Sequence, residues 1–231
     1  MVAKGTKVSI TEETKNPFED HVKFTINPEK KVSFPLYLRV PSWCDNPAAF
    51  IKINNGEKAM MGFIPGEYIK IEKTWEEGDV VTVGFPMKLS LRTWEANKNS
   101  VSVDYGPLTF SLKMDENYVQ DGDGTEEWPA WSIYPASPWN FGLVMNGAKP
   151  SDNFEVLKKA YPSNDMPFTQ EGAPIEIKAK GKIIPEWGMD STFLVEELPL
   201  SPVVSDQPIE EITLIPMGAA RLRISSFPVI R

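Results

Sequence analysis

The sequence predicts an all-β protein made of two consecutive antiparallel β-sandwich domains with jelly-roll-like strand order. Three observations lead to this prediction. Apolar and polar residues alternate with a period of two in many short runs, while helical spacing is hardly visible. Turn residues separate the runs, and the chain contains 21 prolines. The length of 231 residues gives room for two domains of modest size.

The first half of the chain contains a regular series of predicted strands. Val22, Phe24 and Ile26 alternate with polar residues, and the same pattern recurs along the following segments. The predicted strands cover residues 22–26, 32–40, 51–53, 69–71, 81–85, 89–91, 101–105 and 108–112. Turn signals lie at 54–56, 65–67, 77–79 and 106–107. A single sheet could not bury its own apolar face, so these strands predict a sandwich.

The middle of the chain, residues 115–161, is rich in Asp, Gly, Pro and Trp and suggests long loops with a strand near 141–145. Alternation returns at residues 175–179, 193–195, 212–214 and 222–224, and residues 211–227 suggest a hairpin that turns at Met217 and Gly218. We therefore place the domain boundary near 112–116 and predict domains at 1–113 and 114–231. Residues 1–7 lack the apolar segment of a signal peptide and predict a first strand instead.

Composition excludes several classes of function. The formal net charge of −8 disfavours nucleic acid and anionic membrane surfaces as partners. No apolar stretch is long enough to span a bilayer. With Cys44 as the single cysteine and His21 as the single histidine, the chain cannot form an internal disulfide or a zinc cage of thiolates and imidazoles. We expect no metal site and no cofactor in this chain.

Three candidate reactive features have simpler interpretations. His21 precedes an inward-facing valine, so we expect it on the surface beside Asp20. Cys44 has no neighbouring cation to stabilise a thiolate, which favours a small buried hydrophobe. Residues 121–127 resemble the start of a calcium loop, but Glu126 stands where an EF-hand requires glycine. An acidic solvated turn is the favoured interpretation, and no catalytic residue is predicted.

Tryptophans are the most informative local feature. Trp128, Trp131 and Trp139 lie close together in the sequence with Tyr134, and exposed rings of this kind can stack on sugars. The same rings could instead pack a loop onto a domain interface. Trp94, near Arg92 and Asn97, has the same two interpretations. The four tryptophans are therefore candidates for sugar binding or for an interface.

Several phrases in the sequence resemble a known family when taken in order. They are FPLYLRVPSWC (34–44), WEEGD (75–79), FPM (85–87), VSVDYGPL (101–108), PASPWN (135–140) and LIPMGAARLR (214–223). Together they resemble the C-terminal part of the β-L-arabinofuranosidase-like glycoside hydrolases, family 127 and its relatives, formerly a domain of unknown function.

The resemblance implies an (α/α)6 barrel that holds the active site, followed by two β-sandwich domains. It also implies a cysteine nucleophile at a zinc ion and a carboxylate acid/base, all in the barrel. The adjacent cysteines of that centre are absent here, and Cys44 falls in a sandwich phrase. No catalytic residue is carried over, and zinc is expected in the barrel.

We therefore expect a non-catalytic C-terminal β-sandwich region of a glycoside hydrolase that acts on arabinose-containing plant glycans. Its partner would be a catalytic barrel in the same or another polypeptide, which makes Trp94, Trp128, Trp131 and Trp139 candidates for the barrel interface. One alternative is a carbohydrate-binding module that binds plant-type oligosaccharides through these rings. Another is a subunit that pairs with a separately encoded barrel. An apolar face left exposed without the barrel predicts a homo-oligomer.

Overall fold

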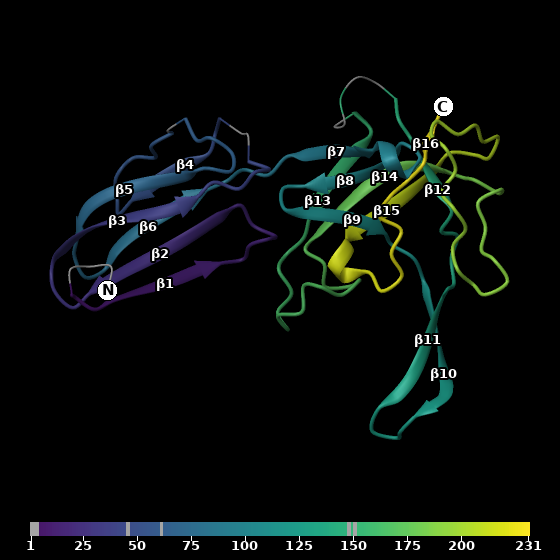
Figure 1. Cartoon of the computed structure of the whole chain (residues 1–231), viewed down its shortest axis with the longest axis horizontal. Helices are drawn as coiled ribbons and strands as arrows, with labels where there is room; N and C mark the ends of the chain where they lie inside the picture. Colours follow the sequence, from purple (N-terminus) through teal and green to yellow (C-terminus); the bar gives the residue numbers. More distant parts are fainter. Residues whose placement is uncertain (1–4, 45–46, 61, 147–148, 150–151) are drawn as a thin grey trace. The chain divides into compact units, whose positions relative to one another are not determined.

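The computed structural model describes residues 5–44, 47–60, 62–146, 149 and 152–231. Most of the predicted first strand, 1–7, and Asp45 beside Cys44 lie outside the described residues. The chain forms two compact units, Met1–Lys88 and Leu89–Arg231. The described residues of both units consist mainly of strands and turns, with short 3-10 segments in the second unit, so the all-β prediction is confirmed (Figure 1). No helix among the described residues is long and apolar enough to cross a membrane.

The described part of the first unit contains six antiparallel strands in two sheets. The strands are β1 (Val8–Thr14), β2 (His21–Pro28), β3 (Val32–Arg39), β4 (Phe50–Ile53), β5 (Tyr68–Trp75) and β6 (Asp79–Gly84). One sheet has the order β1-β2-β6-β4, and β3 pairs with β5 in the other. Five of the six strands overlap the strands predicted from alternation, because each has one apolar face to bury.

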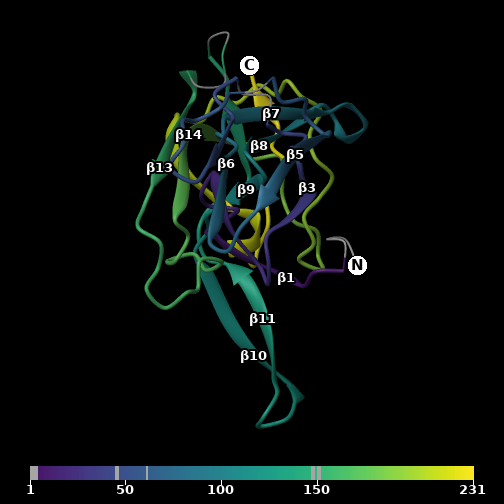
Figure 2. The same ribbon diagram turned by 90° about the vertical axis from the view of Figure 1, so that its left-hand side faces the viewer.

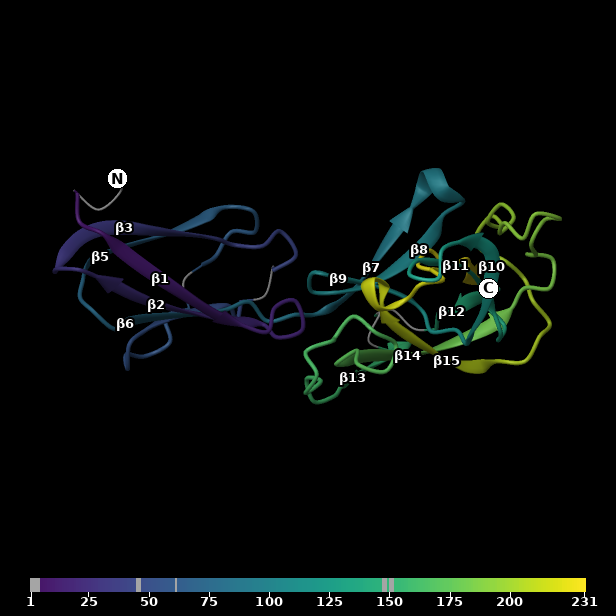
Figure 3. The ribbon, with the colours of Figure 1, turned by 90° about the horizontal axis from the view of Figure 1, so that it is seen from below.

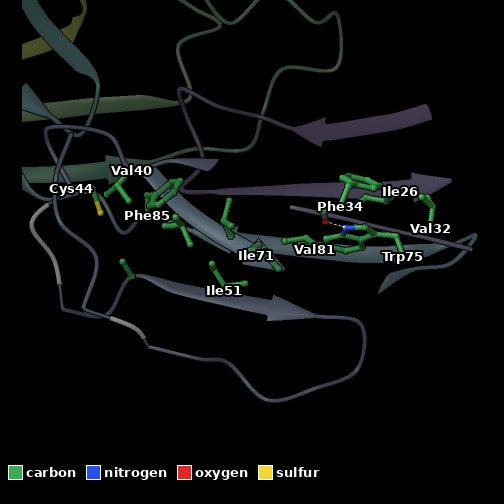
Figure 4. Close-up of a cluster of buried hydrophobic side chains, with 13 residues drawn as sticks. Ile26, Val32, Phe34, Val40, Cys44, Ile51, Ile71, Trp75, Val81 and Phe85 are labelled. Carbon is green, nitrogen blue, oxygen red and sulfur yellow. Dashed lines mark hydrogen bonds between the residues drawn. The ribbon is translucent and has the colours of Figure 1, made fainter. Parts of the chain in front are cut away.

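The two sheets of the first unit share one hydrophobic core (Figure 4). Ile26 and Val81 come from the larger sheet, and Phe34 and Trp75 come from the smaller one. Trp75 has an exposed fraction of 0%, and its Nε1 donates a hydrogen bond of 2.8 Å to the carbonyl oxygen of Phe34. The Trp75 side chain is therefore fully buried, and its one polar group has a hydrogen-bond partner.

A buried carboxylate fixes the turn between β5 and β6. Asp79 is 7% exposed, and it accepts hydrogen bonds from Asn54 Nδ2 at 2.7 Å, Lys73 Nζ at 2.6 Å and the Glu76 amide at 2.8 Å. Burial opposes ionisation, but the bonds from Asn54, Lys73 and Glu76 outweigh it and lower the pKa of Asp79 to about 2. Residues 75–79, the Trp-Glu-Glu-Gly-Asp phrase, thus form a turn that the hydrogen bonds of Asp79 stabilise.

Among its described residues, the second unit contains ten strands and two 3-10 segments. Its strands are β7 (Leu89–Trp94), β8 (Ser100–Tyr105), β9 (Leu108–Leu112), β10 (Glu116–Gly124), β11 (Pro129–Pro135), β12 (Phe141–Val144), β13 (Phe154–Lys158), β14 (Ile175–Ile183), β15 (Glu210–Pro216) and β16 (Val229–Ile230). The 3-10 segments are η1 (Glu95–Asn97) and η3 (Met217–Ala219). Eight strands form one sheet of order β16-β12-β14-β15-β9-β8-β7, with β13 paired to β14 (Figure 3).

The C-terminal segment makes hydrogen bonds with two strands that lie far apart in the order of this sheet. The residues before β16 reach β8, where the amides and carbonyls of Val101 and Phe227 exchange hydrogen bonds of 2.8 and 2.9 Å. β16 itself pairs in parallel with β12 through Leu143 and Val229. The C-terminal segment thus connects β8 with β12, and the sandwich arrangement of the second unit stays a prediction.

The structure divides the chain at a different point from the sequence analysis. The predicted boundary between residues 113 and 114 falls just after β9, but β9 pairs with β15 through Leu112 and Leu214 and so belongs to the second unit. Alternation continues unchanged from β6 to β9, so no change of period marks the true division. The predicted hairpin at 211–227 does not form, because Ile224 accepts a hydrogen bond from the Leu112 amide instead of pairing with β15.

Candidate functional site

The most distinctive feature of the second unit is a hairpin formed by β10 and β11. The two strands form a sheet of their own and extend away from the eight-stranded sheet (Figure 1, Figure 2). At the turn, Gly124 has φ +99°, and a Cβ there would lie 2.5 Å from the carbonyl oxygen of Trp128. Thr125 and Trp128 exchange backbone hydrogen bonds of 3.1 Å across the turn. Glycine is therefore required for the turn that presents Trp128.

The hairpin carries large exposed apolar side chains. Trp128 is 80% exposed and Trp131 is 51% exposed, and Tyr118 and Val119 are also exposed. The rings of Tyr118 and Trp131 meet edge to face, with centroids 6.4 Å apart and planes at 73°. Tyr118 and Trp131 thus form an exposed aromatic pair on one face of the hairpin, and exposed apolar side chains of this size are typical of a site of interaction.

A cluster of polar side chains, which we call the base clamp, fixes the hairpin where it leaves the eight-stranded sheet. Glu116 accepts hydrogen bonds from the Tyr118 hydroxyl at 2.5 Å and from Gln170 Nε2 at 2.9 Å. Gln170 also donates to the Met114 carbonyl, and Arg221 Nη1 donates to the Tyr118 hydroxyl at 2.5 Å. The base clamp thus joins β10 to two distant loops.

Electrostatics stabilise the base clamp in its charged form. Burial of the Glu116 carboxyl disfavours ionisation, yet the hydrogen bonds from Tyr118 and Gln170 and the nearby charge of Arg221 hold the pKa of Glu116 below its usual value. The Arg221 guanidinium lies 3.7 Å from this carboxylate. Glu116 is therefore the ionised centre of the clamp.

Replacing Glu116 with alanine is expected to loosen the hairpin without unfolding the second unit. Loss of a buried charged acceptor costs about 1.5–3 kcal/mol, which corresponds to at least about tenfold faster amide exchange in β10 and β11. Hydrogen-exchange mass spectrometry measures this, with β14 as the internal reference. Glu127→Ala, at an exposed position beyond the clamp, is the matched control and should leave exchange in both strands unchanged. Equal exchange in the two variants would contradict the role of Glu116.

An apolar pocket of about 150 Å³ lies beside the base of the hairpin. Its lining includes Tyr134, Trp139 and Phe193. Tyr134 packs edge to face on Phe193 at 5.6 Å, and Trp139 packs on Trp187 at 5.1 Å. Phe193, predicted in a strand, instead occupies a turn with φ +62° that Asp190 holds through bonds to the Thr192 and Leu194 amides.

The four candidate tryptophans do not form one site. Trp128 and Trp131 share the hairpin, whereas Trp139 is half-buried against Trp187 in a cluster with Ile184 and Ile230. Trp94 is 41% exposed, but its Nε1 donates to Ser102 Oγ at 2.9 Å and the Arg92 guanidinium covers its ring at 4.6 Å. Trp128 and Trp131 are thus the pair most available to a partner.

The surroundings of His21, Cys44 and the acidic segment 121–127 agree with their simpler interpretations. His21 is exposed, with its ring nitrogens 3.5 Å from Glu19 and 3.6 Å from Asp20, as expected. Cys44 is buried in the core of the first unit, also as expected. Asp121 accepts a hydrogen bond of 2.6 Å from Ser132 across the hairpin. Within the described part of the chain, no group of three or more His, Cys, Asp or Glu residues is arranged to hold a metal ion.

Sequence analysis missed the base clamp. Glu116, Gln170 and Arg221 are far apart in the chain, and only folding brings them together. The one local signal is the spacing of Glu116 and Tyr118, which places both side chains on the same face of a strand. That spacing is too common to identify a cluster.

Comparison with known proteins supports the predicted resemblance. Residues 1–87 match the family model described as the middle domain of β-L-arabinofuranosidase, GH127, and this match ends where the first unit ends. No curated protein matches the chain.

Solved structures share the fold of the whole chain. A GH127 β-L-arabinofuranosidase from Geobacillus stearothermophilus T6 matches with a TM-score of 0.60 and 24% identity, over 99% of this chain and 31% of its own. A structure described as a glycoside hydrolase matches with a TM-score of 0.60 and 24% identity, over 97% of this chain and 32% of its own. A GH127 β-arabinofuranosidase matches with a TM-score of 0.63 and 19% identity, over 99% of this chain and 33% of its own. The chain spans about a third of the length of these structures.

Proposed function

We propose that this chain is a non-catalytic accessory region of a glycoside hydrolase and lies beside a catalytic (α/α)6 barrel. The observation that carries the proposal is the match of residues 1–87 to the GH127 middle domain, which coincides with one compact unit of the structure. The similarity of nearly the whole chain to one third of each solved GH127 structure supports the same role. The substrate of the parent enzyme would be an arabinose-containing plant glycan.

The side chains of this chain do not fit the zinc–thiolate centre that the family resemblance implies. Such a centre needs several thiolates around one ion. Cys44 is the sole cysteine, and its side chain packs in the hydrophobic core of the first unit. His21, the sole histidine, lies on the surface between two carboxylates. We therefore assign zinc and the catalytic residues to the barrel and no catalytic step to this chain.

Activity measurements and the gene sequence test the proposal together. The purified chain, incubated with zinc and an aryl β-L-arabinofuranoside, should release no aryl alcohol. The DNA upstream of the Met1 codon should continue in frame and encode helices and adjacent cysteines. Zinc-dependent hydrolysis by the chain alone would overturn the non-catalytic role. A stop codon close upstream would overturn the shared polypeptide and favour a separately encoded barrel.

A further inference from the structure

The tip of the hairpin, residues 121–128, combines an exposed ring with negative charge. Asp121, Asp123, Glu126 and Glu127 are all exposed around Trp128. The sequence contains no Lys or Arg between Lys113 and Lys149. Among the described residues, no salt bridge engages any of these four carboxylates. The tip is therefore an apolar projection with an acidic rim and no compensating cations.

The hairpin holds this tip in a defined conformation before any partner binds. The base clamp fixes β10, and Asp115 and Ala136 close the base of the hairpin with a backbone hydrogen bond of 2.8 Å. At the other end, Gly124 and the paired amides of Thr125 and Trp128 define the turn. A preorganised projection loses little conformational entropy on binding, which favours affinity.

Ring geometry favours a protein surface over a glycan as the occupant. A row of sugar rings stacks on open aromatic faces, but Tyr118 and Trp131 are inclined at 73° and present one edge and one face. Asp121 is already bonded to Ser132, which reduces its capacity to accept from sugar hydroxyls. A tryptophan that enters an apolar pocket, surrounded by charges matched across the interface, is the usual centre of a protein–protein contact.

We infer that the β10–β11 hairpin is a docking arm whose Trp128 enters an apolar pocket edged by lysine or arginine on the catalytic domain. The inference rests on the proposed function for the identity of that domain. The length of the solved relatives supports this occupant, because about two thirds of each lies outside the match to this chain. A second copy of this chain is a poorer occupant, because its net charge of −8 opposes the acidic tip.

Photo-crosslinking from the tip tests the docking arm in the complete gene product. Trp128 is replaced by p-benzoylphenylalanine, the protein is irradiated, and the crosslinked peptides are sequenced by mass spectrometry. The expected result is a crosslink to apolar residues of the catalytic domain that are flanked by Lys or Arg. The same substitution at Val204, which is 71% exposed in the second unit, provides the matched control and should give a low yield.

A charge-reversal variant provides the second arm of the test. The triple variant Asp123→Lys, Glu126→Lys and Glu127→Lys should reduce the crosslink from position 128 by about tenfold, because like charges then face each other. The control variant Glu155→Lys, Glu186→Lys and Glu210→Lys changes the net charge equally at exposed positions and should leave the yield unchanged. Crosslinks to a second copy or to a glycan, or a yield equal to that at Val204, would overturn the docking arm. The reading frame of the gene tests the proposed function separately.

Discussion

Replacing Trp75 with alanine is expected to lower the free energy of unfolding of the first unit by about 3–5 kcal/mol. The indole is completely buried between the two sheets, and its removal would leave a cavity beside Phe34 and Val81. The hydrogen bond from Nε1 would also be lost, which leaves the Phe34 carbonyl without this donor. A loss of this size is a large part of the stability of a typical domain.

Urea unfolding followed by circular dichroism measures this loss, and hydrogen exchange in β3 and β5 assigns it to the first unit. Trp128→Ala removes the same side chain at an 80% exposed position and is the matched control. We expect the control to stay within about 0.5 kcal/mol of the wild type. Similar losses in the two variants would contradict the assignment of Trp75 to the core.

Replacing Asp79 with asparagine is expected to destabilise the first unit by about 2 kcal/mol at neutral pH. The pKa of Asp79 falls from an ordinary value of 3.8 to about 2 in the folded chain. Because the folded pKa is lower, the ionised carboxylate stabilises the fold fully above about pH 4 and loses this effect as pH falls toward 2. Asparagine also leaves Lys73 without its carboxylate partner.

Unfolding experiments between pH 2 and 7 check both parts of this prediction. The wild type should lose stability relative to Asp79→Asn as pH falls through the interval from about 4 to about 2, so the two curves converge. Glu57→Gln, which neutralises an exposed carboxylate of the same unit, should follow the wild-type curve. A constant difference between wild type and Asp79→Asn across the whole range would show that ionisation of Asp79 is not the cause.

Local patterns in the sequence predicted the strands of the first unit well. Val22, Phe24 and Ile26 alternate because β2 lies on a core, and the turn at residues 77–79 contains the glycine that its positive φ requires. Both signals act over a few residues, so a single sequence contains them. The resemblance of the sequence phrases agrees with the family model that residues 1–87 match.

Features that depend on residues far apart in the chain could not be predicted from such local patterns. The true division of the chain lies within a continuous series of alternating strands, so the turn-rich hairpin was mistaken for the start of a domain. The partners of Trp139 and Trp94 decide their exposure, and those partners, Trp187 and Ser102, cannot be read from neighbouring positions. The exposed pair Trp128 and Trp131 stayed among the candidates because their hairpin has little else to pack against.

The bridge between Val101 and Phe227 has a consequence for synthesis of the chain. These residues are separated by most of the second unit, so this contact has a high contact order and cannot form until Phe227 has left the ribosome. The first unit pairs only residues before Lys88 and can fold earlier. During translation the nascent second unit therefore keeps unpaired strand edges for longer, and it is the part of the chain that we expect to need chaperones.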